Sequence, residues 1–306
     1  MGNIVSLVHI QSADEIKNSI YKALNLINFN INKQVRTVAI KPNLCYYWDA
    51  STGYTTDPLI IAGIIDWVRD SCGEDIDIKI VETDASAMRT NLAFSILGYE
   101  KLAIEKGVEL VNLSEGQSSD KKVYVNNREI EFKVPQLLQE VDLFINAPKL
   151  KVMRITRITC AMKNLFGCIS STRKILYHPY LNETIVGINK ILKPQLTLVD
   201  GQVALGRYPI KLGLLMASTD VFSIDWIASV IMGYNPLKLD FLNIALKENV
   251  GSRNGLSTVG ENPKEFKKMF PKEGIVPTEY LWSLQIGLLK AYAKIVNDVI
   301  PPSIQD

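Results

Sequence analysis

Short runs of β-branched and aliphatic residues alternate along this chain with longer amphipathic stretches, and this alternation constrains the fold more than any other feature. Strand-length runs separated by helix-length segments predict a mainly parallel sheet flanked by helices, because a parallel strand needs a crossover connection. The predicted strands are residues 4–10, 36–40, 76–82, 108–112, 142–146, 195–199 and 212–217, and the predicted helices are residues 12–27, 57–72, 92–106, 155–169 and 220–232.

Two regions depart from this alternation. In residues 121–133 the run VYVNNREIEF predicts a β-hairpin turning at Asn126-Asn127. No repeat or low-complexity linker divides the chain, so residues 1–250 are predicted to form one α/β unit. Residues 251–277 are rich in Gly, Pro, Asn and Lys and predict an irregular connection. An amphipathic helix follows, and its apolar stripe is Leu281, Leu284, Leu288, Ala291, Ile295 and Val299. We expect this helix to dock on the same body; the alternatives are a membrane surface, a partner protein or self-association.

Charge and cysteine content exclude several classes of protein. The 34 basic and 32 acidic residues nearly balance, which gives no support to nucleic-acid binding. No window of eighteen uninterrupted apolar residues predicts a transmembrane segment. The four cysteines are scattered without a C-x-x-C pair, so we expect no iron–sulfur cluster. Scattered, reduced thiols and the lack of a secretory signal favour a cytoplasmic protein.

Polar side chains follow the predicted strands at their carboxyl ends. In a parallel sheet these ends share one edge, where open α/β folds bind ligands. Lysine is a poor helix cap and is costly at a crowded edge without a partner, so we expect an anion site there. An ion-pair network of these lysines with the neighbouring acids is the structural alternative. The residues are Lys41, Asn43, Glu82, Asp84, Asn146, Lys149, Lys151, Asp200 and Ser218–Asp220. For Ser218–Asp220 the alternative interpretation is a cap for the helix that follows.

The stretch KVMRITRITCAMKNLFG, residues 151–167, carries four cations through an otherwise apolar segment. Within the predicted helix 155–169, Thr156, Thr159, Lys163 and Gly167 share one narrow face. The helix would begin at the proposed site, where its free N–H groups favour an anion. Arg154 and Arg157 would add planar donors, although a solvated basic face explains the arginines equally well.

Chemistry beyond binding has few candidates in the sequence. His178 is the plausible imidazole for proton transfer, and Lys163 and Asp84 are the other catalytic candidates. Arg173 and Asn164 are further predicted ligand contacts. Glu82, Asp84 and Asp200 offer oxygen ligands for a divalent metal such as Mg²⁺. No nucleophile elbow, Walker-type loop or G-x-G-x-x-G motif occurs.

The same residues carry a family resemblance. IKPN at 40–43, NAPKLK at 146–151, MKNLFG at 162–167, KPQLTLVDG at 193–201 and ASTDVFSIDWIASVIMG at 217–233 occur in the order of the shared elements of the DUF362 family. The chain therefore resembles that family from about residue 36 to 235. Many of its members carry a ferredoxin-like cysteine cluster that is missing here, and Met153 stands where a histidine is frequent.

These observations favour an enzyme, or a degenerate enzyme, that acts on an anionic small molecule. The first alternative is a non-catalytic protein that binds a metabolite or docks to a redox partner through its C-terminal helix. The second is a scaffold whose polar edge is only an ion-pair network.

Overall fold

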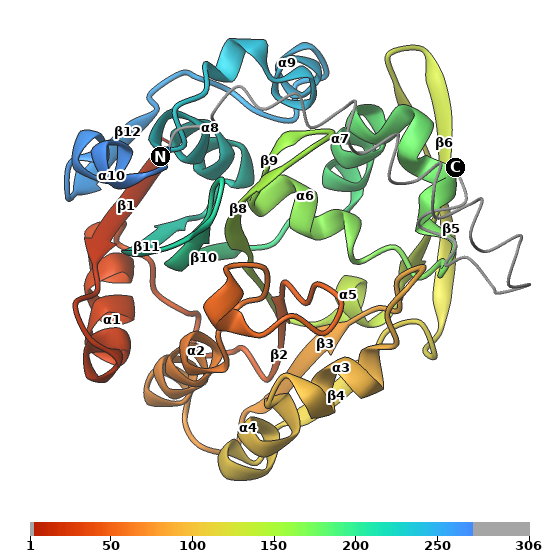
Figure 1. The fold of residues 1–306 in the computed structure, drawn as a ribbon. Helices are drawn as coiled ribbons and strands as arrows, with labels where there is room; N and C mark the ends of the chain where they lie inside the picture. Colours follow the sequence, from red (N-terminus) through yellow and green to blue (C-terminus); the bar gives the residue numbers. More distant parts are fainter. Residues whose placement is uncertain (1–2, 272–306) are drawn as a thin grey trace, which may run out of the picture.

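A ten-stranded sheet, with strands in the order β12-β1-β11-β10-β7-β2-β3-β4, organises the computed structural model, which describes residues 3–271 (Figure 1). β8 pairs with β10 beside this path, and β9 pairs with β8. The strands are β1 (Ile4–His9), β2 (Thr37–Pro42), β3 (Asp77–Glu82), β4 (Glu109–Asn112), β7 (Leu143–Ala147), β8 (Lys149–Met153), β9 (Arg157–Thr159), β10 (Leu196–Leu205), β11 (Pro209–Ser218) and β12 (Ser257–Gly260).

The sheet is mainly parallel, as predicted. β10, β7, β2, β3 and β4 pair in parallel, whereas β11 is antiparallel to both β10 and β1. A separate antiparallel hairpin, β5 (Ser118–Val125) and β6 (Arg128–Pro135), turns at Asn126 and Asn127, which both have a positive φ. The predicted fold class and the predicted hairpin are confirmed. The hairpin packs against α7 (Leu181–Ile191) at one side of the molecule (Figure 1).

Helices cover both faces of the sheet and give it two apolar cores. One core contains side chains of α1 (Ile16–Leu26), α2 (Pro58–Cys72), α3 (Thr90–Ile96) and α4 (Tyr99–Lys106). The other contains side chains of α5 (Leu137–Glu140), α6 (Ala161–Phe166), α7, α8 (Val221–Ile231), α9 (Asp240–Lys247) and α10 (Pro263–Met269). Strands buried on both faces need continuous apolar runs, and all five residues of β7 are buried.

The predicted helix over residues 155–169 is wrong in its first half. Lys151 pairs with Thr159 and Met153 with Arg157, so this segment is the β8–β9 hairpin, and α6 begins only at Ala161. Its β-branched residues fit a pleated strand better than a helix. Arg157 has a φ of 64°, a left-handed conformation that ends helical geometry.

Other boundaries also differ from the prediction. Residues 92–106 form two helices, α3 and α4, because Gly98 takes a left-handed backbone with a φ of 80° between them. β10 continues through Asp200 to Leu205, so Asp200 lies within the strand. β12 and α10 occur in the stretch predicted to be irregular. The predicted C-terminal helix lies outside the described residues, and within residues 3–271 no helix has both the length and the apolarity to cross a membrane.

The antiparallel direction of β11 corrects one part of the predicted site. β11 ends with Ser218 paired to Thr197 at the start of β10, and the chain leaves β11 in the direction opposite to that of β2 and β3. Asp220 accepts a hydrogen bond from the Ser223 N–H at 2.9 Å and thereby caps α8. The helix-cap interpretation of these residues is therefore the correct one.

Candidate functional site

A cavity of about 570 Å³ opens beside the ends of β2 and β3 and the β8–β9 hairpin, a size typical of sites for small molecules. Its wall includes side chains from four strands, from α6 and from the segment before α7. The polar and charged side chains that line it are Lys41, Asn43, Cys45, Tyr46, Glu82, Thr83, Ser86, Lys151, Arg154, Thr159, Lys163, Asn164, Lys174 and His178. This cavity is called the lysine cavity below.

Lys41 and Glu82 form a buried ion pair in the wall of the lysine cavity. The Lys41 Nζ lies 2.9 Å from the Glu82 Oε2, and it also donates to the Pro42 carbonyl at 2.9 Å. Glu82 in turn accepts the backbone N–H of Thr83 at 3.0 Å. A Cβ added at Gly167 would lie 2.9 Å from the Lys41 Nζ, so a glycine there leaves room for the ammonium group.

Three asparagine side chains connect the strand ends to α6. The Asn43 Nδ2 donates to the Asn164 Oδ1 at 2.8 Å, and the Asn164 Nδ2 donates to the Asn146 Oδ1 at 2.8 Å. The Asn146 Nδ2 completes the chain by donating to the Ala161 carbonyl at 3.1 Å. These amides therefore fix α6 against β2 and β7. Asn146 itself is not part of the cavity wall.

A buried carboxylate from a neighbouring helix holds the start of α6. The Asp225 carboxylate of α8 accepts the backbone N–H groups of Ala161 at 2.6 Å and Met162 at 3.0 Å. Burial raises the pKa of the Asp225 carboxyl to about 7. These two hydrogen bonds set where Lys163 lies, because it follows Met162 directly.

Three of the cavity's lysines have no carboxylate partner among residues 3–271. The Lys151 Nζ donates to the Asn43 Oδ1 at 2.6 Å and to the Tyr54 carbonyl at 2.7 Å. The Lys174 Nζ donates to the Gly167 carbonyl at 2.9 Å and to the Thr83 hydroxyl. The partly buried Lys163 Nζ lies 5.7 Å from the centre of the Phe166 ring and has no hydrogen bond or ion pair within that range.

Burial changes the ionisation of these same lysines. It lowers the pKa of Lys151, and it lowers the pKa of Lys163 and of Lys174 to about 8. The charge of Lys151 lowers the pKa of Lys163 further. Glu82 acts in the opposite direction on Lys174, whose pKa still falls because burial has the larger effect. Each of these ammonium groups would be stabilised by an anion in the cavity.

The structure brings together many of the predicted site residues. Lys41, Asn43, Glu82, Lys151, Arg154, Thr159, Lys163, Asn164, Gly167 and His178 all line the lysine cavity. The exposed Arg173 lies at a neighbouring hollow beside Arg89, and the buried Lys174, next in sequence, occupies the cavity instead. Cys45 is not among the predicted site residues, and Thr83 lines the cavity because it directly follows Glu82 at the end of β3.

Lys149 and Asp200 form a second ion pair outside the cavity wall. Both side chains are fully buried, and the Lys149 Nζ lies 2.8 Å from the Asp200 Oδ2. The two Asp200 oxygens also accept the backbone N–H groups of Asp57 at 2.8 Å and Gln202 at 2.9 Å. Lys149 and Asp200 therefore fit the alternative prediction, in which the lysines at this edge form ion pairs with neighbouring acids and do not bind an anion.

The Asp84 carboxylate is also held by hydrogen bonds from neighbouring protein groups. Its carboxylate accepts the backbone N–H of Thr90 at 2.8 Å and hydrogen bonds from Arg89 at 3.1 Å and Asn112 at 3.2 Å. Burial would raise the pKa of Asp84, but the hydrogen bonds from Thr90 and Arg89 outweigh it and hold this pKa below its ordinary value. Asp84 does not line the lysine cavity.

The three predicted metal ligands do not converge. Glu82 faces Lys41, Asp200 faces Lys149, and Asp84 caps α3. Across residues 3–271 no group of three or more His, Cys, Asp or Glu side chains is arranged to hold a metal ion. The arrangement of these acids therefore gives no support to the predicted magnesium site.

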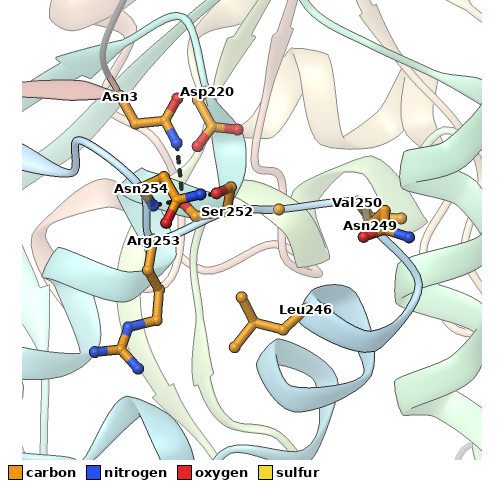
Figure 2. Close-up of a pocket in the computed structure, with 9 residues that line it drawn as sticks. Asn3, Asp220, Leu246, Asn249, Val250, Ser252, Arg253 and Asn254 are labelled. Carbon is orange, nitrogen blue, oxygen red and sulfur yellow. Dashed lines mark hydrogen bonds between the residues drawn. The ribbon is translucent and has the colours of Figure 1, made fainter.

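A second hollow, beside Asp220 and the segment before β12, has a different character (Figure 2). Its labelled side chains are mostly small polar groups, and the Asn3 Nδ2 donates to the Ser252 carbonyl at 2.9 Å. Asp220 is occupied as the cap of α8, and the Arg253 guanidinium lies 5.0 Å from the centre of the Trp226 ring. The hollow lacks the buried lysines that distinguish the first cavity.

Sequence comparison identifies the family. The model of a domain of unknown function, DUF362, matches residues 38–229, which contain every residue that lines the lysine cavity. The chain belongs to the DUF362 family. The resemblance predicted from the strand-end motifs is thereby confirmed.

Relatives of this DUF362 chain define its fold more than its activity. The thylakoid-associated protein sll1697 of Synechocystis sp. is 25% identical over 235 residues, which cover 72% of this chain and 70% of that protein. The lactate racemase apoprotein of Thermoanaerobacterium thermosaccharolyticum has a similar structure, with a TM-score of 0.52 at 11% identity. That match covers 75% of this chain and 57% of the racemase chain, so this chain spans less than two thirds of it. At this identity the likeness concerns the fold alone.

Proposed function

We propose that this DUF362 chain binds a small molecule with a carboxylate or phosphate group in the lysine cavity. The observation that carries the proposal is an imbalance of charge in the wall. Five cationic side chains line the cavity (Lys41, Lys151, Arg154, Lys163 and Lys174), and Glu82 is the one carboxylate that lines it within residues 3–271.

The energetics of buried charge support an anion as the missing partner. Glu82 neutralises Lys41, but Lys151 and Lys174 donate to uncharged groups and Lys163 lies near an aromatic ring, so these three have no carboxylate partner within residues 3–271. An ammonium group removed from water without a counter-charge is destabilised, and this is the physical cause of the lowered lysine pKa values. A bound anion would reverse that penalty through charge-assisted hydrogen bonds.

The proposal needs no metal. Its cationic groups are side chains, and the acids predicted as metal ligands have other partners. His178 lines the same cavity and stays a candidate for proton transfer, and a lactate racemase provides a structural precedent for small-molecule binding on this fold. Saturable binding is the property to measure first, because it does not depend on turnover.

Isothermal titration at constant ionic strength tests the proposal, with lactate and inorganic phosphate as probes. Lys163→Met retains the aliphatic stem and removes the ammonium group, and we expect it to weaken binding of the better probe at least about tenfold, the equivalent of one lost charge-assisted hydrogen bond. Its stability should change little, because Lys163 has no hydrogen bond to lose within the described residues.

The matched control is Lys101→Met on α4, an exposed lysine outside the cavity that removes the same charge. It should bind both probes like the wild type. Equal affinity in Lys163→Met and the wild type, or equal losses in both variants, would show that the cavity lysine does not hold the anion.

A further inference from the structure

Lys163 differs from the other lysines of the cavity in what its amine does. Lys41, Lys151 and Lys174 each donate at least two hydrogen bonds, which fix their ammonium groups in place. The Lys163 Nζ is in the same wall and makes none within residues 3–271, and it lies 5.7 Å from the centre of the Phe166 ring. It is therefore the cavity amine that is free to react.

Its surroundings also favour the neutral form. The pKa of Lys163 is about 8, lowered by burial and by the charge of Lys151. A desolvated lysine beside another cation is the arrangement that activates an amine as a nucleophile toward carbonyl compounds. Lys174 has a similar pKa, but its amine is engaged by Thr83 and Gly167.

We infer that the Lys163 Nζ forms a reversible imine with the carbonyl carbon of an oxo acid, a molecule with a ketone or aldehyde group and a carboxylate or phosphate, held in the lysine cavity. This inference rests on the proposed function, because the anion site would hold the acid group. It adds a covalent step and a substrate class. The cations supply the attraction for the acid group, and the unpartnered amine supplies the nucleophile.

The reaction balances without an oxidant or reductant. The lone pair of the neutral amine forms a C–N bond as the carbonyl π electrons move to oxygen. A proton passes from the nitrogen to that oxygen, which gives a neutral carbinolamine. Nitrogen then forms the C=N bond while the C–O bond breaks, and oxygen leaves as water after it gains a second proton, the one that nitrogen loses. One amine and one carbonyl thus give one imine and one water.

A buried hydroxyl in the same wall fits this chemistry. Thr159 is 2% exposed, it lines the cavity, and its Oγ1 has no hydrogen-bond partner within residues 3–271. A buried hydroxyl without a partner is uncommon, because it loses its hydrogen bonds to water. The carbonyl or carbinolamine oxygen of a bound oxo acid would supply the acceptor.

Reductive trapping tests the inference. The full chain is incubated with pyruvate or with dihydroxyacetone phosphate, and sodium cyanoborohydride then reduces any imine to a stable secondary amine. With pyruvate, one site should gain the mass of pyruvic acid less one oxygen atom. Because trypsin does not cleave at a modified lysine, the label should appear on a peptide spanning residues 158–173, with Lys163 uncleaved.

One variant and one control compound separate the covalent step from anion binding. Lys163→Arg keeps the positive charge but has no amine that can form an imine, so it should lose the label, while thermal stabilisation of the wild type by pyruvate reports anion binding separately. Acetone, a carbonyl compound without an acid group, should label Lys163 at least tenfold more slowly than pyruvate. The exposed Lys101 should remain unlabelled under the same conditions.

The outcomes distinguish this inference from the proposed function. A label confined to Lys163 by either oxo acid supports it. Saturable stabilisation by pyruvate with no label, or with label spread over exposed lysines, overturns the imine and leaves the anion site standing. The absence of both stabilisation and label overturns the two together.

Discussion

Removing either partner of the buried Lys149–Asp200 pair should destabilise the fold strongly. Neither side chain is exposed to solvent, and their charged atoms are 2.8 Å apart. Loss of one member of such a pair leaves the other charge uncompensated and costs about 3–5 kcal/mol. We expect Lys149→Met and Asp200→Asn each to lower the free energy of unfolding by about that amount.

The free energy of unfolding of the double variant shows whether the two charges depend on each other. Lys149→Met with Asp200→Asn removes both charges, and the asparagine Oδ1 can still accept an N–H group in place of the carboxylate. Independent effects would sum to about 6–10 kcal/mol from the range for each single change. We expect the double variant to cost less than either single change.

Equilibrium urea unfolding of the four proteins measures this coupling. Lys101→Met is the comparison, because its exposed pair with Glu105 should contribute only about 0.2–1 kcal/mol. A decrease of less than about 1 kcal/mol in the free energy of unfolding for Lys149→Met would refute the reasoning, since removal of the cation from a buried pair at this distance should leave an uncompensated charge. Binding of lactate should be unaffected in Lys149→Met at temperatures where it is folded, because Lys149 does not line the cavity.

Three further changes have expected outcomes. Lactate affinity should fall as pH rises through about 8, where the Lys163 ammonium loses its proton. Titration calorimetry should show a smaller fall in Lys163→Met, and identical pH profiles of affinity in the variant and the wild type would contradict this prediction. The folded-state pKa of Asp225, about 7, exceeds its ordinary 3.8, so the free energy of unfolding should decline as pH rises from about 4 to about 7. Asp225→Asn should flatten that decline in urea unfolding series, and an unchanged slope would assign it to another group. Gly167→Ala places a methyl group 2.9 Å from the Lys41 Nζ and 3.0 Å from the Asn164 carbonyl, so it should lower the free energy of unfolding in urea by about 1–3 kcal/mol and weaken lactate binding in titration calorimetry. Wild-type values in both measurements would contradict this steric argument.

Hydrophobic patterning was enough to predict the sheet and most of its strands. Residues 36–40 and 142–146 were placed within two residues of β2 and β7, because a strand buried on both faces needs an unbroken apolar run. The same pattern could not predict the direction of β11. Chain direction depends on which neighbour pairs with it, and a tight connection from β10 makes that neighbour antiparallel.

The candidate site was predicted through strand ends more accurately than through helix faces. Lys41 and Glu82 line the cavity because β2 and β3 end beside it, and Lys151 lines it because β8 forms part of the wall. Thr159 and Lys163 also line it, although the continuous helix predicted to join them does not exist. Pairing of Lys151 with Thr159 across β8 and β9 brings that segment to the cavity, and residues 154–156 between these strands carry none of the Asn-Gly or Asp-Gly turn signals that predict a hairpin.

Lys149 illustrates what composition at a strand end cannot decide. It lies two residues before Lys151, and both side chains are buried. Lys149 meets the Asp200 carboxylate, whereas Lys151 meets neutral oxygens beside the cavity. The difference arises because β10 continues alongside β8 and places Asp200 opposite Lys149. That pairing belongs to the tertiary structure and cannot be predicted from the composition of the strand end.

The chain of amides from Asn43 through Asn164 to Asn146 has a consequence for how this protein responds to acid and base. Amide groups do not titrate, so the scaffold that joins β2, α6 and β7 keeps the same donors and acceptors over the whole physiological range. The amines of Lys163 and Lys174 change their charge near pH 8 on that invariant frame. Alkaline conditions would thus weaken the attraction of the lysine cavity for an anion without changing the hydrogen bonds among these three amides.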